Sequence, residues 1–206
     1  MVAVAKLHQV SYEAVGLSDF GKTSDYIARQ LKRWSEQYEY TRTIENPYMD
    51  NLIDYLPKNM PVDDECTVVH GDLQIANMMM HRDKNEVIAL LDWELSTLGN
   101  PLSDFAYLCR PYRDVLRNQD LKALGIPSEE EYVARYCELT GRSEIKDWDY
   151  YVAFNIFRLA AILQGIAKRV QDGTAASKHA ETAGAGAYNM AKIAWAQIDK
   201  SVSLDD

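Results

Sequence analysis

Four polar residues follow two apolar runs near the middle of the sequence, and their types suit proton transfer and metal binding. His70, Asp72 and Asn77 come directly after the run CTVV, and Asp92 comes directly after VIALL. A carboxylate can accept the proton of a hydroxyl group, and carboxylate and amide oxygens are ligands that Mg²⁺ takes in proteins. If VIALL is a buried strand, Asp92 emerges beside the loop that carries the other three residues. The pattern therefore predicts a carboxylate base next to a magnesium site.

The interval between Asp72 and Asn77 fits H-x-D-x-x-x-x-N, the spacing of kinase catalytic loops. In such a loop the Asp meets the acceptor hydroxyl, while the Asn reaches back to a metal bound to the nucleotide phosphates. Taken singly, Asp72 could be a turn residue and Asn77 a helix cap. Together with Asp92 they favour a kinase-type loop. We expect His70 to brace this loop by hydrogen bonding rather than to act as an acid or base.

The elements predicted to position these residues are mainly helical. The runs MMMH and VIALLDW are separated by the polar turn RDKNE and predict a β-hairpin over 78–92. Helical spacing of apolar residues and N-cap signals predict helices, which lie within 25–38, 46–56, 100–109, 128–141, 147–173 and 180–200. The predicted fold class is therefore mainly α with a small β-hairpin (α+β), in a single domain over 1–206.

Composition limits the classes of function. The net charge of −9 at pH 7 argues against general nucleic-acid binding, because a protein neutralises phosphates with a basic face. The three widely spaced cysteines, Cys66, Cys109 and Cys137, fit a reduced cytoplasmic compartment better than a disulfide framework. We see no signal-peptide pattern and no run that approaches the roughly 18 apolar residues of a membrane span. Neither secretion nor a membrane is expected.

Three segments carry a family resemblance: HGDLQIANMMMH, VIALLDWELSTLGNPLSDFAYL and GLSDFGKTSDYIARQLKRWSEQY. They closely resemble the aminoglycoside phosphotransferase family, in the branch of kinase-like domains found alone in bacteria and fused to acyl-CoA dehydrogenases in animals. The resemblance runs along nearly the whole chain and is specific from Gly16 to Tyr107. It implies that Asp72 is the catalytic base or the carboxylate that orients the acceptor hydroxyl, that Asn77 and Asp92 are Mg²⁺ ligands, and that ATP is the phosphoryl donor.

Further candidates are Asp104, Glu94 and Arg158. Asp104 looks like the family's buried Asp that hydrogen-bonds the catalytic loop, although a first-turn acid could equally satisfy helix N–H groups. Glu94 follows the metal-binding Asp92 by two residues and is a candidate to face the cleft. Arg158 is a charge inside an otherwise apolar helix and should have a partner, which is either an anionic substrate or a buried Asp.

A kinase of this type also has an N-terminal lobe, with a five-stranded sheet, a Gly-rich loop over the phosphates and a strand Lys. Before His70 the sequence offers two helices and neither a Gly-rich loop nor such a Lys. The resemblance therefore implies the C-terminal helical lobe with the N-lobe absent. The chain would be a deliberately shortened lobe, a fragment that starts late, or a protein that uses the lobe for binding. An uncovered lobe surface should be partly apolar, which predicts a homodimer or a protein partner.

The leading interpretation is a small-molecule phosphotransferase that moves the γ-phosphoryl group of ATP to a hydroxylated substrate. By analogy with the fused relatives, an acyl thioester or similar metabolite is a better acceptor than an aminoglycoside. The alternative is a non-catalytic kinase-like binding module. A zinc hydrolase built from His70, Asp72 and His81 is disfavoured, because the histidines form no H-x-x-x-H pair and Mg²⁺ suits the oxygen groups better.

Overall fold

The computed structural model describes residues 1–61, 65–175 and 180–204 of the 206-residue chain. Its internal contacts group into two compact units. The first unit comprises Met1–Tyr26 and Asp63–Trp148, and the second comprises Ile27–Val62 and Asp149–Asp206. The single domain predicted over 1–206 is not tested by this grouping and stays a prediction.

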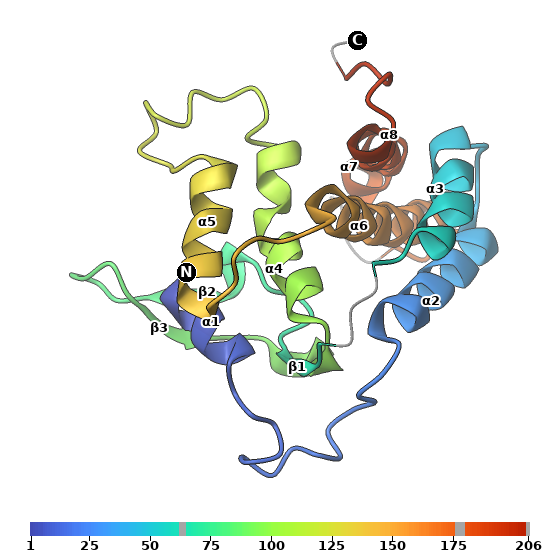
Figure 1. The fold of residues 1–206 in the computed structure, drawn as a ribbon. Helices are drawn as coiled ribbons and strands as arrows, with labels where there is room; N and C mark the ends of the chain where they lie inside the picture. The colour runs from blue at the N-terminus through green and yellow to red at the C-terminus, as the bar shows by residue number, and fades with distance from the viewer. Residues whose placement is uncertain (62–64, 176–179, 205–206) are drawn as a thin grey trace. The chain divides into compact units, whose positions relative to one another are not determined.

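The first unit combines helices with short strands and 3₁₀ turns (Figure 1). In chain order its elements are α1 (Val2–His8), β1 (Thr67–Val69), η1 (Ile75–Asn77), β2 (Met78–Met80), β3 (Val87–Leu90), η2 (Trp93–Leu95), β4 (Thr97–Gly99), α4 (Pro101–Cys109), η3 (Arg110–Arg113) and α5 (Glu129–Thr140).

The strands of the first unit form two antiparallel pairs. β2 pairs with β3, with Met78 opposite Leu90, so the predicted hairpin is present. Its strands end at Leu90 rather than at residue 92, because Asp92 adopts a left-handed backbone conformation that leaves the ladder. β1 pairs with β4, and the sequence did not predict β4. Three residues are too few to show a periodicity, and the partner of β4 lies 30 positions earlier in the chain.

The core of the first unit forms around α4, all of whose residues are buried. The helix begins at Pro101, and the Asn100 side chain caps it by accepting a hydrogen bond from the backbone N–H of Ser103 (2.9 Å). Phe105 of α4 stacks on Tyr136 of α5, with ring centroids 4.0 Å apart. The predicted helices at 100–109 and 128–141 are therefore present.

The second unit is helical in its described residues. Its elements are α2 (Tyr26–Thr41), α3 (Pro47–Lys58), α6 (Trp148–Gln171), α7 (Ala180–Ala185) and α8 (Ala187–Ile198), and the first residues of α2 and α6 belong to the first unit. α3 packs on α8, where the Tyr55 and Trp195 rings meet edge to face at 5.8 Å. The Tyr150 hydroxyl of α6 donates to the Leu56 carbonyl of α3 (2.9 Å).

Helix α6 is the long helix predicted at 147–173. Among the described residues it alone is long and apolar enough to cross a membrane, by length and composition only. However, 67% of its apolar window is buried inside the protein, and a buried core helix gives the same signal.

Candidate active site

The loop after β1 turns sharply at Gly71, between His70 and Asp72. Gly71 has a φ of +81°, and a Cβ atom there would lie 2.2 Å from the carbonyl oxygen of Leu95. Only glycine tolerates both the positive φ and this close approach. His70 is fully buried, and Asp72, two residues later, is half-buried. The turn thus brings Asp72 out of the core to the surface of the first unit.

Asp72 and Asn77 are directly bonded to each other. The Asn77 side-chain N–H group donates to both the backbone oxygen and the Oδ2 atom of Asp72, each at 2.9 Å. Gln74 also donates to Asp72 Oδ2 (2.9 Å). The 3₁₀ turn η1 folds the backbone between the two residues and ends at Asn77, so the two side chains can meet. With its nitrogen turned toward Asp72, the amide of Asn77 directs its Oδ1 atom away from that carboxylate.

Asp92 is linked to the same loop through the residue before it. The Leu91 N–H donates to the Asn77 carbonyl (2.8 Å), and the Leu91 carbonyl is hydrogen-bonded to His70 Nε2 (2.8 Å). Asp92 itself is exposed and has a φ of +63°. A non-glycine residue in this conformation costs about 1–2 kcal/mol, and such strain is concentrated at functional sites. The residue before Asp92 is thus bonded to both His70 and Asn77, while the roles predicted for His70, Asn77 and Asp92 stay predictions.

Asp104 supports the loop after β1 through hydrogen bonds to its backbone. It is 4% exposed, and its Oδ2 and Oδ1 atoms accept hydrogen bonds from the backbone N–H groups of His70 (2.7 Å) and Gly71 (3.0 Å). His8 Nε2 lies 3.2 Å from Oδ2. Burial raises the pKa of Asp104, but the interaction with His8 and the two backbone bonds outweigh it, so the pKa lies below its ordinary value. Of the two predicted roles, the geometry matches loop support.

The His70 imidazole makes bracing contacts. In addition to its bond to Leu91, its ring packs against Trp93, with centroids 4.8 Å apart. Glu94 lies on the exposed η2 turn of the same unit. Arg158 is 6% exposed in α6 of the second unit, so the structure does not place it with the other candidates.

Sequence reasoning missed three residues of this arrangement: Gln74, His8 and Tyr136. Gln74 is bonded to Asp72, and its position inside the loop motif was a usable signal. His8 and Tyr136 lie 96 and 32 positions from Asp104, and no local pattern could have connected them to it.

The oxygen groups of Asn77 and Asp92 fit a magnesium ion better than a zinc ion. Mg²⁺ is commonly bound by one or two protein carboxylates together with substrate phosphates and water. Among the described residues there is no group of three or more His, Cys, Asp or Glu side chains that could hold a metal on its own. A metal at this site would therefore share its coordination with a ligand such as a phosphate.

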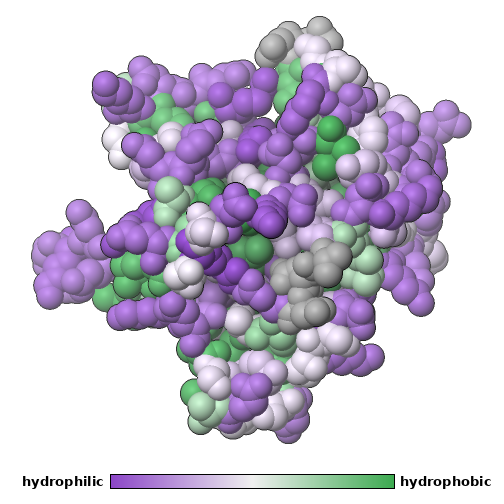
Figure 2. Space-filling view, in the orientation of Figure 1, coloured by the Kyte–Doolittle hydropathy of each residue, from purple (hydrophilic) through white to green (hydrophobic). Residues whose placement is uncertain are grey.

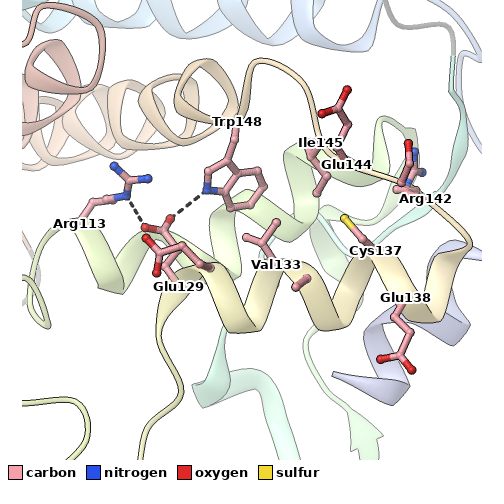
Figure 3. A pocket seen from close by; sticks show the side chains of 12 residues that line it. Arg113, Glu129, Val133, Cys137, Glu138, Arg142, Glu144, Ile145 and Trp148 are labelled. Carbon is pink, nitrogen blue, oxygen red and sulfur yellow. Dashed lines mark hydrogen bonds and ion pairs between the residues drawn. The ribbon is translucent and has the colours of Figure 1, made fainter.

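A cavity of about 540 Å³ lies elsewhere in the first unit, between α5 and the segment 142–148 (Figure 3). Trp148 donates a hydrogen bond to Glu129 (2.9 Å), and Arg113 forms an ion pair with the same carboxylate. Val133 and Cys137 line the apolar part. None of the candidate site residues lines this cavity, so it is separate from the loop described above.

The sequence matches known proteins along most of its length. The model of the "Phosphotransferase enzyme family" matches residues 2–149. Acyl-CoA dehydrogenase family member 10 of Mus musculus is 44% identical over 200 residues, which are 93% of this chain and 19% of that protein. The probable acyl-CoA dehydrogenase IBR3 of Arabidopsis thaliana is 34% identical over 224 residues, which cover 99% of this chain and 27% of that protein.

Solved structures show the same fold. The crystal structure of a "putative aminoglycoside phosphotransferase" from Ralstonia eutropha JMP134 is 44% identical, with a TM-score of 0.92 over 97% of this chain and 63% of that one. Choline kinase from Cryptosporidium parvum has a TM-score of 0.59 at 13% identity, which shows the fold alone. The chain thus spans about a fifth of the mouse relative and less than two thirds of the Ralstonia protein.

Proposed function

Because this chain belongs to the phosphotransferase enzyme family, we propose that it transfers the γ-phosphoryl group of ATP to a hydroxyl group of a small molecule. The observation that carries the proposal is the bonded arrangement of Asp72, Asn77 and the Leu91–Asp92 segment. It joins the half-buried carboxylate of Asp72 to the Asn77 side chain, and it bonds Asn77 to the residue before Asp92, so it supports a base next to two possible metal ligands.

Each residue has a role that follows from its position. Asp72 receives both side-chain bonds on Oδ2, so its Oδ1 atom can accept the proton of an acceptor hydroxyl. Asn77 and Asp92 would hold Mg²⁺ through their side-chain oxygens. When bound, the ion would neutralise charge on the transferring phosphoryl group. His70 and Asp104 keep the loop in place, and Glu94 and Arg158 remain candidates to contact the substrate.

We also propose that the chain corresponds to the C-terminal lobe of a two-lobed kinase. The support is the first unit, in which helices and short strands position the loop after β1, and the partial coverage of the Ralstonia protein. In that case the nucleotide site is completed by contacts from another lobe. The acceptor is proposed to be a hydroxylated acyl thioester or a similar metabolite, by analogy with relatives named as acyl-CoA dehydrogenases.

The test is a calorimetric titration of the chain with MgATP, alongside Asp92→Ala and a matched control, Asp83→Ala. Asp83 is an exposed aspartate in the hairpin turn and lies outside the site. We expect binding to be lost in Asp92→Ala and retained in Asp83→Ala. Equal binding by all three proteins, or no binding at millimolar nucleotide, would count against a metal–nucleotide site in this chain.

A second candidate function, a kinase-like binding module, is favoured by the apolar surface around the loop. Side chains of η1, the hairpin and η2 that are at least 41% exposed are Ile75, Met79, Met80, Ile88, Leu91, Trp93 and Leu95. Figure 2 shows apolar surface beside the hydrophilic hairpin tip at the left of the view. We propose that a second copy of the chain or another protein covers this surface.

The compartment and the excluded partners are proposals as well. The net charge of −9 supports the absence of a nucleic-acid partner, and the cysteines Cys66, Cys109 and Cys137, which form no disulfide in the described residues, support a cytoplasmic location. The burial of α6 supports a protein without a membrane partner.

A further inference from the structure

A chain of buried polar side chains connects the catalytic loop to helices α1 and α5. It starts at Asp104, whose Oδ2 atom accepts the backbone N–H of His70 and is also bonded to His8 Nε2 (3.2 Å). His8 Nδ1 in turn is hydrogen-bonded to the hydroxyl of Tyr136 (2.7 Å). His8, Asp104 and Tyr136 are 5%, 4% and 0% exposed. The imidazole thus bridges α4 and α5 with both of its nitrogens.

The same chain extends from Tyr136 toward the surface. The positive charge of Arg142 acts on Tyr136, and the Arg142 guanidinium forms two bonds to the carboxylate of Glu65. A phenol in this position stays a neutral hydroxyl, because burial raises the pKa of Tyr136. Each group between Asp104 and Tyr136 can therefore form hydrogen bonds with two neighbouring groups.

Chemistry determines what His8 does for Asp104. An ionised carboxylate only accepts hydrogen bonds, so His8 Nε2 must donate. Without that donor, Oδ2 would lose one of its two bonds in a site that water does not reach, and an under-bonded buried carboxylate is costly. Asp104 would then turn or protonate, and either change weakens its hold on the amides of His70 and Gly71.

We propose that His8 and Tyr136 are positioning residues of phosphoryl transfer: through Asp104 they fix the loop that presents Asp72. Tyr136 fixes the rotation of the imidazole, His8 fixes the carboxylate, and the carboxylate fixes two consecutive amides directly before Asp72. The role in transfer rests on the proposed function, whereas the positioning of the loop does not.

The first experiment measures hydrogen exchange of the His70 and Gly71 amides by NMR in four variants of the full chain. Tyr136→Phe removes the hydroxyl and keeps the ring that stacks on Phe105. His8→Leu removes both ring nitrogens, and His8→Gln restores one N–H donor toward Asp104. The control is Tyr132→Phe, the same change one turn earlier on α5, where the ring also stacks on Phe105 (6.1 Å).

We expect exchange at both amides to become roughly tenfold faster in Tyr136→Phe and faster still in His8→Leu. His8→Gln should lie closer to the unmodified protein than His8→Leu does, and Tyr132→Phe should leave the exchange unchanged. The proposal is overturned if Tyr136→Phe behaves like Tyr132→Phe, or if His8→Gln rescues nothing. Because Tyr136→Phe is the smallest change, failure of His8→Leu to fold would leave the comparison of the two tyrosine variants to decide.

The second measurement is turnover of MgATP with water as the acceptor. We expect Tyr136→Phe to lower kcat by roughly three- to tenfold while changing the KM for MgATP less, because the two supported amides directly precede Asp72, whereas the proposed metal ligands Asn77 and Asp92 lie farther along the chain. If the chain by itself does not turn over MgATP, the result would count against catalysis by this chain alone, and the exchange rates would then decide the positioning role by themselves. If exchange at the two amides is unchanged in Tyr136→Phe and turnover is normal, only the positioning role is contradicted.

Discussion

Gly71 determines, as a single residue, where the side chain of Asp72 lies. Its positive φ and the nearby Leu95 carbonyl are two separate constraints, one of conformation and one of space. The sequence shows the glycine within the H-x-D motif but not the carbonyl that approaches it. Gly125 has a similar φ of +67° with nothing within 4 Å of a Cβ atom, so it isolates the conformational part.

We therefore predict that Gly71→Ala destabilises the protein much more than Gly125→Ala does. The conformational cost at Gly125 is about 1–2 kcal/mol, and Gly71→Ala adds the displacement of the Leu95 backbone to that cost. The free energies of unfolding should be measured in urea for both variants. Equal losses in the two variants would mean that the loop relaxes around the methyl group and that the contact with Leu95 is not essential.

A second prediction at this scale concerns acid. The pKa of Asp104 is lowered in the folded protein from its ordinary value of 3.8, so the folded state binds a proton less readily than the unfolded state. The resulting stabilisation is present above the unfolded pKa and is lost as the pH falls through the folded pKa. The stability difference between the unmodified protein and Asp104→Asn should therefore be large at neutral pH and shrink below pH 3.8. A difference that is independent of pH would contradict the ionised, bonded carboxylate.

At the scale of elements, the signals at helix ends were the most informative. Asn100 and Ser128, the first residues of the predicted ranges 100–109 and 128–141, cap helices α4 and α5. Helix α2 begins one residue later than predicted, because Asp25 takes a φ of +56°. Strand β4 could not be predicted, since its three residues are held by a long-range pairing with β1 and not by a local pattern.

The capping box at the start of α5 predicts how much one substitution should lower the free energy of unfolding. The Ser128 hydroxyl accepts the Glu131 N–H (3.2 Å), and the Glu131 carboxylate accepts the Ser128 N–H (2.8 Å). Replacing Ser128 with Ala should lower the free energy of unfolding by about 1 kcal/mol, because a helix N–H group loses its partner. Ser18→Ala, at an exposed position outside the helices, is the control and should change little in the same thermal unfolding experiment.

At the scale of the whole chain, the candidate site combines what the sequence could and could not reveal. The fixed spacing of Asp72 and Asn77 and the position of Asp92 after a strand are local patterns; in the structure Asn77 is bonded to Asp72 and to Leu91, the residue before Asp92. The support through His8 and Tyr136 depends on segments that meet only in the folded unit. Residues far apart in sequence carry no shared periodicity, so the supporting side chains had to come from the structure.

The apolar surface around the loop leads to a prediction about association. We expect the chain to self-associate in sedimentation velocity experiments as its concentration rises, and Ile88→Lys, on β3 and 55% exposed, to weaken that association. Val115→Lys is the matched control, because Val115 is also apolar and is 68% exposed but lies in a different segment. A monomer at all concentrations, or equal effects of both lysines, would count against this surface as an interface.

The hairpin between the two halves of the site is closed at both ends by backbone bonds. At its base the Leu91 N–H binds the Asn77 carbonyl (2.8 Å), and near its tip the His81 N–H binds the Glu86 carbonyl (2.7 Å). The bond at the base fixes the backbone next to Asp92, so a change in the length of the hairpin tip should not alter the geometry of Asp92. The segment 82–85 is thus the natural place to insert a fluorescent label or an affinity tag, which would leave the geometry of Asp92 unchanged.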